Sequence, residues 1–353
     1  MAEAEGLLRS AETAREPDAA IAAATQAVTA FRAALDLAPV ARVPFDWAET
    51  QIRLCVALRL LGALLDDVDL LNDAIRSGQA ALSVPLLGPT LRVGAPQDGV
   101  PQEGAPQEGA QQDGAPQDGL PQEGAPQVWA RARAALGSVY VVLGERDGDL
   151  GTLAEAAASY AEALAGFPRE KFPRDWARMM RNRGAALAML GEVANDPDAL
   201  IDAIGCYRAA LEVYSPPAAL ADWARADWAL ADWALTHSNL GQALRLLAER
   251  TADKSLAAQH LREAVDACEA ALTVTVRDAA PEEWAMTTTN LANALAALGE
   301  RAGDTGLLRR AIDAYREALG ALGGPRWLPQ RAIARHNLAL AERHLAAREA
   351  PAG

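Results

Sequence analysis

The chain has 353 residues, of which 51% are apolar, so it can bury a large core and is not a wholly disordered polypeptide. Phe, Trp and Tyr together make up only 5%, which favours close-packed helices over sheets rich in aromatic and β-branched residues. Acidic residues outnumber basic ones by 47 to 33, and the resulting net charge of -14 makes nucleic acid and anionic membranes poor partners.

The cysteines and the N-terminal residues point to a cytoplasmic protein. Cys55, Cys206 and Cys268 lie far apart without a CxxC pair, which excludes a disulfide scaffold and the usual zinc site and fits a reducing compartment. Residues 1–6 contain no basic run before an apolar segment, and no stretch approaches about 18 uninterrupted apolar residues. We therefore expect neither a signal peptide nor a membrane span.

An internal repeat dominates the sequence. In each unit a tryptophan is followed fourteen residues later by leucine, and an alanine further on is followed seven and eight residues later by Ala-Leu. The tryptophans are Trp47, Trp129, Trp176, Trp233 and Trp284, and the alanines are Ala27, Ala74, Ala156, Ala203, Ala264 and Ala311. The undisturbed unit of 47 residues accommodates two amphipathic helices with apolar residues at i, i+3, i+4 and i+7.

Each second helix has its own start signal. An aspartate follows the end of each complete first helix by about one turn, where its carboxylate can accept hydrogen bonds from the free N-H groups of the next helix. These aspartates are Asp67, Asp149, Asp196, Asp253 and Asp304. In the core of the second helix, Cys268 takes the place that Phe31, Tyr160, Tyr207 and Tyr315 hold in other units, so we interpret it as a small core residue rather than a nucleophile.

In chain order, residues 1–93 should form two helix hairpins and residues 129–350 four more, followed by a capping helix that begins near Arg331. Between them, residues 94–128 read as a disordered Gly/Pro/Gln pentad-repeat loop with six acidic residues and no basic one. A second pentad repeat contains Trp223 and Trp228 next to Trp233. Steps of five residues rotate by about 140° on a helix, so at least one of these tryptophans should be exposed. DNA slippage without selected function is an equally good origin for both insertions.

The motifs resemble the tetratricopeptide repeat family. The first helix of that family carries an Asn-Leu-Gly-Asn-Ala core, which appears here as Asn290-Leu291-Ala292-Asn293-Ala294, and its second helix carries the pattern seen from Ala311 to Leu319. The long unit is similar to a bacterial variety found beside CHAT protease or NTPase modules, whereas the usual unit has about 34 residues. The resemblance implies an all-α, right-handed α-α superhelix of six hairpins and a C-terminal capping helix, with a protein-binding surface and no chemistry of its own.

Searches for catalytic patterns support that expectation. The four histidines have no metal-ligand spacing, and no phosphate-binding glycine loop is present. The acidic run Asp66, Asp67 and Asp69 is typical of some metal-diphosphate sites, but Asp67 falls on the capping position. We predict a protein that is not an enzyme and uses no metal or cofactor. An (α/α) toroid enzyme is the formal alternative.

The first helices line the concave groove in the tetratricopeptide family, and this places the candidate partner-binding residues. Six of them are amides that recur six or nine residues after the first-helix landmark: Asn182, Asn239, Gln242, Asn290, Asn293 and Asn337. The alternative is that these asparagines only hold neighbouring helices together. Arg181 is the one firm cation at the carboxylate-clamp positions, so we do not expect an acidic chain terminus as ligand, and Trp223 and Trp228 are candidate exposed anchors.

Two functions follow from this pattern. The first is a non-catalytic scaffold that binds a protein segment in its concave groove. The alternative is a regulatory or sensor subunit of a signalling or defence effector, a CHAT protease or NTPase, that is encoded elsewhere. The partner and the oligomeric state stay open.

Overall fold

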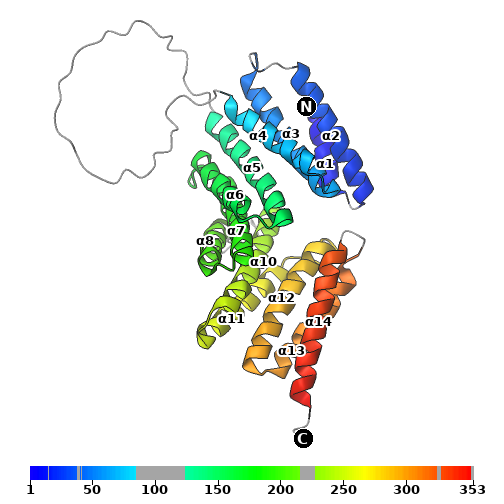
Figure 1. Ribbon diagram of the computed structural model, residues 1–353, viewed down its shortest axis with the longest axis vertical. Helices are drawn as coiled ribbons and strands as arrows, with labels where there is room; N and C mark the ends of the chain where they lie inside the picture. The colour runs from blue at the N-terminus through cyan, green and yellow to red at the C-terminus, as the bar shows by residue number, and fades with distance from the viewer. Residues whose placement is uncertain are drawn as a thin grey trace, which may run out of the picture.

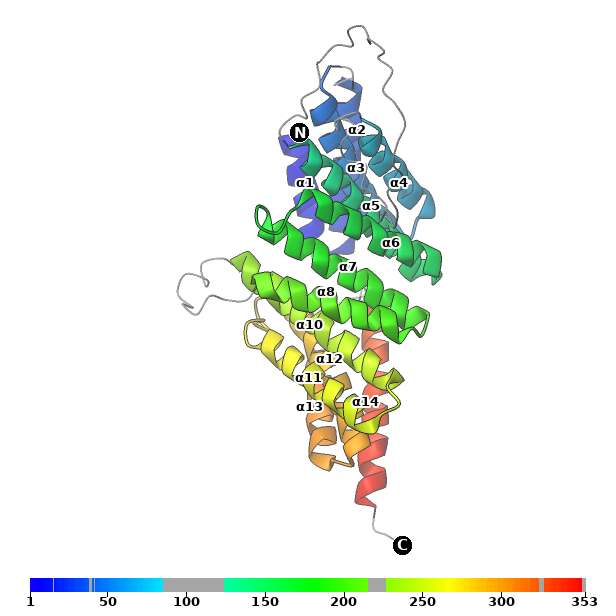
Figure 2. The ribbon, with the colours of Figure 1, turned by 90° about the vertical axis from the view of Figure 1, so that its left-hand side faces the viewer.

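The computed structural model describes residues 1–14, 16–37, 40, 42–84, 124–214, 227–323 and 327–350. Over these ranges the chain is almost entirely α-helical and contains no strand, which confirms the predicted all-α class. The helices follow one another along the long axis of an elongated molecule, and the two ends of the chain lie at opposite ends of it (Figures 1 and 2).

Consecutive helices pack as antiparallel hairpins. The described residues form six such pairs followed by a single helix, as the repeat predicts. The pairs are α1 (Ala2–Thr13) with α2 (Pro17–Leu37), α3 (Pro44–Leu65) with α4 (Val68–Ser83), α5 (Ala125–Asp147) with α6 (Leu150–Ala163), α7 (Pro173–Val193) with α8 (Pro197–Tyr214), α10 (Asp227–Arg250) with α11 (Lys254–Leu272), and α12 (Pro281–Ala302) with α13 (Thr305–Ala321). The last helix is α14 (Leu328–Glu349), and a short 3-10 helix, η2 (Leu164–Gly166), follows α6.

One boundary differs from the sequence-based expectation. Helix α5 begins at Ala125, so the expected loop end at residue 128 lies four residues too far along the chain. The last pentad belongs to the helix because Ala125 and Val128 are buried, and because Pro126 occupies the first turn, where its missing N-H is tolerated. The rest of the expected loop, 94–123, lies outside the described residues.

All five predicted aspartate caps are confirmed. In each case a carboxylate oxygen accepts a hydrogen bond from a backbone N-H two or three residues further on. The distances from the carboxylate oxygen to the backbone nitrogen are 2.8 Å for Asp67 and Asp69, 2.7 Å for Asp149 and Thr152, 2.9 Å for Asp196 and Asp198, 2.8 Å for Asp253 and Leu256, and 2.8 Å for Asp304 and Gly306. Hydrogen bonds from the Thr152 hydroxyl and amide also lower the pKa of Asp149. These contacts satisfy N-H groups that a helix start otherwise leaves unpaired.

Several hairpins are held by the close approach of a small residue on the first helix to a larger residue on the second. Gly184 of α7 faces the fully buried ring of Tyr207 of α8, and Gly137 of α5 faces Tyr160 of α6 in the same way. In the hairpin of α10 and α11 the bulky position is Cys268, which is buried against Gly241. Burial raises the pKa of the Cys268 thiol to about 12, so its interpretation as a core residue is confirmed.

The contact at Gly184 generates a stability prediction. A Cβ atom at this position would lie 2.9 Å from Cε1 of Tyr207, closer than van der Waals contact, whereas a Cβ at Gly205 of α8 in the same hairpin would meet nothing within 4 Å. We expect Gly184→Ala to lower the free energy of unfolding by about 1 to 3 kcal/mol through overpacking. Gly205→Ala should raise it by up to about 1 kcal/mol, because alanine is the better helix former.

Thermal unfolding followed by circular dichroism measures both effects. Equal midpoints for the two variants would show that the buried ring does not restrict residue 184.

Candidate binding groove

A groove of about 1020 Å³ lies in the C-terminal part of the solenoid. Its walls are α10, α12 and α14, which are the first helices of the last two described hairpins and the final helix. The connection between α11 and α12 contributes Val274, Thr275 and Val276 to the lining, and α13 contributes Tyr315. First helices therefore line this hollow, the position that the resemblance to the tetratricopeptide family implies for a groove, and we call it the C-terminal groove.

An apolar stripe crosses the C-terminal groove. Leu235, Met286 and Ile333 lie on three successive walls, each two residues after the first-helix landmark, and these residues are 45%, 46% and 59% exposed. The equivalent residues of the three preceding first helices are charged, and they are Glu49, Arg131 and Arg178. Sequence reasoning missed the stripe, although aligning this one position across the repeats would have found it.

Charged residues at the stripe position are paired in the N-terminal half. Arg131 of α5 forms an ion pair with Glu49 of α3, and Arg178 of α7 pairs with Asp175 one turn earlier at 2.7 Å. The side chains that face the same way in the C-terminal half are apolar and have no such partner. Among these first helices, the residue at the stripe position is therefore apolar and exposed in the C-terminal groove, and charged and paired in the preceding repeats.

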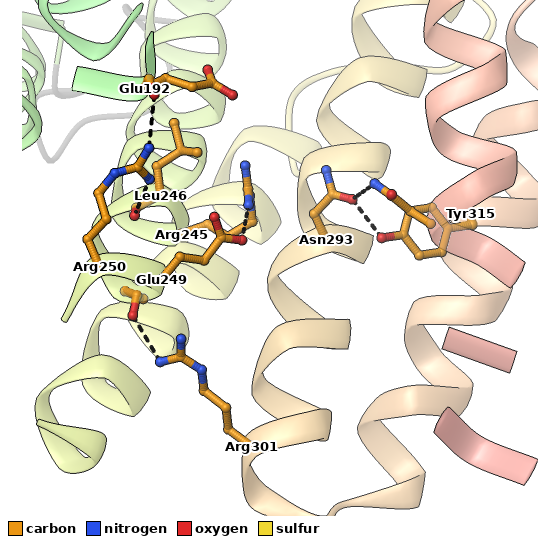
Figure 3. A network of polar contacts seen from close by, with 10 residues as sticks. Glu192, Arg245, Leu246, Glu249, Arg250, Asn293, Arg301 and Tyr315 are labelled. Carbon is orange, nitrogen blue, oxygen red and sulfur yellow. Dashed lines mark hydrogen bonds and ion pairs between the residues drawn. The ribbon is translucent and has the colours of Figure 1, made fainter. Parts of the chain in front are cut away.

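Three of the predicted amides join helices to one another. The Nδ2 atom of Asn290 donates to the Ser238 hydroxyl at 3.1 Å, which links α12 to α10. Asn293 Oδ1 accepts two hydrogen bonds, one from the Tyr315 hydroxyl at 2.6 Å and one from Nδ2 of Asn337 at 2.9 Å, and these link α12 to α13 and α14 (Figure 3). The alternative interpretation, that the asparagines hold neighbouring helices together, applies to these three.

The other predicted residues have different surroundings. Asn239 and Gln242 line the groove and make no side-chain hydrogen bond within the described part of the chain. Arg181 lies on α7 beside the groove, where it forms a mostly buried ion pair with Asp232, and its guanidinium also donates to Asn182 Oδ1 at 3.4 Å. Arg181 is thus already neutralised by a residue of the groove wall.

The tryptophan pair cannot be placed in the same way. Trp223 lies outside the described residues. Trp228 falls within α10, but its side chain is not described.

The C-terminal groove is acidic. Five carboxylates line it, and they are Glu192, Asp232, Glu249, Glu283 and Glu300. Among the lining residues the basic ones are Arg245, which pairs with Glu249, and His344, whose Nδ1 lies 3.3 Å from Glu300. A site lined by one sign of charge attracts ligands of the opposite sign.

Two further arginines near the groove bind backbone carbonyls at helix ends. Arg250 donates to the carbonyl oxygens of Glu192 at 3.0 Å and Leu246 at 2.9 Å, and Arg301 donates to that of Ala248 at 2.9 Å (Figure 3). These contacts join successive hairpins and favourably place positive charge at helix C-termini. Arg250 and Arg301 themselves do not line the groove, so the groove stays acidic although these arginines lie close by.

Groups with catalytic potential lie in structural positions. The thiols of Cys55, Cys206 and Cys268 are free and buried, and burial raises the pKa of all three. Asp67 caps α4, and Oδ1 of Asp66 forms an ion pair with Nε of Arg146 at 2.7 Å. No three His, Cys, Asp or Glu side chains within the described ranges are grouped as metal ligands.

Comparisons with known proteins give weak matches to solved structures. No family model and no curated protein matches the chain. Among solved structures, it is similar to BtubC (BKLC) from P. vanneervenii, with 19% identity over 88% of this chain and 95% of that one and a TM-score of 0.45. The chain is also similar to a designed circular tandem repeat protein, with 17% identity over 98% of this chain and 76% of that one and a TM-score of 0.33. It is similar to yeast Tom70 as well, with 13% identity over 99% of this chain and 66% of that one and a TM-score of 0.33.

The helical-repeat fold rests on the pairing of the chain's own helices. In the described parts of the chain, no helix is long and apolar enough to cross a membrane.

The hydrogen bond from Tyr315 to Asn293 can be tested by removing one hydroxyl. We expect Tyr315→Phe to lower the free energy of unfolding by about 1 kcal/mol, the usual net value of an intramolecular hydrogen bond. Tyr140→Phe is the matched control, because Tyr140 is partly buried and its hydroxyl has no hydrogen-bond partner within the described residues, and its effect should stay within about 0.5 kcal/mol. Chemical unfolding of both variants measures the difference, and equal stabilities would contradict a structural role for the Asn293 contact.

Proposed function

We propose that the protein is a non-catalytic scaffold that binds a segment of another protein in the C-terminal groove. The observation that carries the proposal is the apolar stripe of Leu235, Met286 and Ile333, which is about half exposed on three packed helices. Exposed apolar side chains bordered by polar ones mark binding grooves on folded proteins. Beside the stripe, Asn239 and Gln242 offer amide groups that can pair with the polar groups of a partner.

The groups around the groove favour binding over catalysis. The Ser238 hydroxyl, which lines the groove, receives hydrogen bonds from Asn290 at 3.1 Å and Thr287 at 3.2 Å rather than facing a histidine base. Burial raises the pKa of Tyr315, which keeps its hydroxyl protonated. A serine activated as a nucleophile would instead need a base within hydrogen-bond reach.

The alternative function is a regulatory or sensor subunit of a signalling or defence effector encoded elsewhere, a CHAT protease or an NTPase. It is supported by the long-unit motifs that resemble the bacterial variety found beside such modules. The three free thiols suit a reducing cytoplasm under either proposal. The two functions use the same groove and differ only in the identity of the partner.

Affinity capture from native lysate with mass spectrometry tests the proposal. We expect the wild-type protein to retain a stoichiometric partner that is lost from the double variant Leu235→Asp with Met286→Asp, because two new charges would be buried unpaired in the contact. The matched control is Ile201→Asp, a comparably exposed residue on α8 away from the groove. Retention of the partner by the groove variant would contradict the proposal.

Two further variants test the insertions. A deletion of residues 94–123 should retain the partner if the insertion only connects helices, and Trp223→Ala with Trp228→Ala should weaken capture if either ring is an anchor. A partner that carries a protease or NTPase domain would favour the regulatory alternative.

A further inference from the structure

We propose that the C-terminal groove selects a basic amphipathic helix, a segment with one apolar face flanked by lysines or arginines. This inference rests on the proposed function and names the chemistry of its ligand. It is drawn from the position of the apolar stripe, from the charge of the groove, and from the charge of the chain itself.

The apolar stripe sets the length of the segment. Helices α10, α12 and α14 are successive neighbours. Packed helices lie 8 to 10 Å apart, so Leu235, Met286 and Ile333 span roughly 20 Å across the groove. A bound helix rises 1.5 Å per residue, so about 13 residues cover that span, and apolar residues spaced by seven, about 10.5 Å, face successive stripe residues.

Acidic residues border the groove on both sides of the stripe. Asp232 and Glu283 precede the stripe residues of their helices by three positions, and Glu192, Glu249 and Glu300 lie near the opposite ends of their helices. On α12 the two sides are 17 residues apart, which corresponds to about 25 Å along the axis. We call these two sets of carboxylates the acidic rims.

The room between the rims favours a helix over an extended segment. The rims are about 25 Å apart on α12, which is enough for a helix that is about 10 to 12 Å wide with its side chains. Met286 lies about 4.5 Å along the axis from Glu283 and about 21 Å from Glu300, so a helix over the stripe brings its lysine or arginine side chains to the rim of Asp232 and Glu283. An extended strand is narrower, with neighbouring strands only about 4.8 Å apart, and turns alternate side chains toward and away from the groove floor, so it fills less of that width.

The charges of the rims favour a cationic ligand. Glu192 and Glu283 form no ion pair within the described part of the chain, so no arginine or lysine of the described residues neutralises either carboxylate directly. The chain's own insertion, 94–128, carries six acidic residues and no basic one, and is therefore repelled. A second copy of the protein brings a net charge of -14 and is repelled as well. A basic segment of another protein is the ligand that complements the groove.

Fluorescence anisotropy with synthetic peptides tests the inference on the full chain. The probe is a labelled peptide of about 18 residues, long enough for five helical turns, with leucines at i, i+3, i+4 and i+7 and lysines elsewhere. Two comparison peptides keep its length: one alternates leucine and lysine, and the other replaces every lysine with glutamate. We expect the first peptide to bind at least about tenfold more tightly than either comparison, and its affinity to fall as salt is raised.

Protein variants locate the binding site. Glu283→Lys with Glu300→Lys reverses one charge on each rim, and Met286→Ser removes the centre of the stripe; each should weaken binding by about tenfold or more. The control is Asp266→Lys with Glu317→Lys, which changes the net charge by the same amount at exposed residues of α11 and α13 outside the groove. It should stay within about twofold of the wild type, and circular dichroism checks that every variant keeps its helical content.

Several results would overturn the inference. An equal loss of peptide affinity in the rim variant and in its charge-matched control would mean that the attraction is non-specific. Tighter binding of the peptide that alternates leucine and lysine would exclude a helical ligand. Preference for the glutamate peptide would reverse the charge rule while leaving the scaffold proposal intact, since that proposal fails only if partner capture is independent of the groove. A wild-type dimer that Met286→Ser dissociates in sedimentation, or a small molecule retained in native mass spectrometry, would assign the groove to another occupant.

Discussion

The close approach of paired helices is the constraint on which the rest of the structure depends. A glycine of the first helix meets the ring of a tyrosine on the second, as Gly184 meets Tyr207. In the second hairpin the sizes are exchanged: Gly78 of α4 lies opposite Cys55 of α3 and receives Leu136 of α5. Such a contact fixes the rotation of one helix against its partner, and equivalent positions of α10, α12 and α14 face the same groove. A groove shared by several repeats requires that regularity.

On this regular framework, the properties of the groove depend on which residues occupy the free face. In the N-terminal half these are charged residues that neutralise each other, as Arg131 and Glu49 do across two helices. In the C-terminal half they are apolar, and Asn239 and Gln242 lie beside them. In the N-terminal half the paired charges leave few groups free for a ligand. In the C-terminal groove apolar and amide groups stay exposed. Such exposure normally lowers the stability of a fold, and it is retained at binding sites.

The sequence predicted those features that depend on neighbours close along the chain. The repeat gave the helix pairs, Asp253 and its equivalents gave the helix starts, and Cys268 was recognised from its place in the pattern. Contacts between hairpins were not predictable in the same way, because they depend on how one hairpin rotates against the next. The pairing of Arg181 with Asp232, and of Asn290 with Ser238, joins residues about one repeat apart, and periodicity alone does not select such partners. The start of α5 was misplaced because burial of Val128 overrides the loop-like composition of its pentad.

Helix α14 couples the end of the solenoid to the groove. Within the described residues it packs against α12 and α13, through Asn337 to Asn293 and through an ion pair of Glu342 with Arg316 at 2.7 Å. Helices with few neighbours open more readily than the core of a fold. Ile333 on this helix supplies the last third of the apolar stripe, so opening of α14 would dismantle the groove, and a ligand that spans all three walls must hold α14 in place. At a ligand concentration of 100 times Kd this linkage contributes about 2.7 kcal/mol to the form in which α14 is packed and the groove is complete.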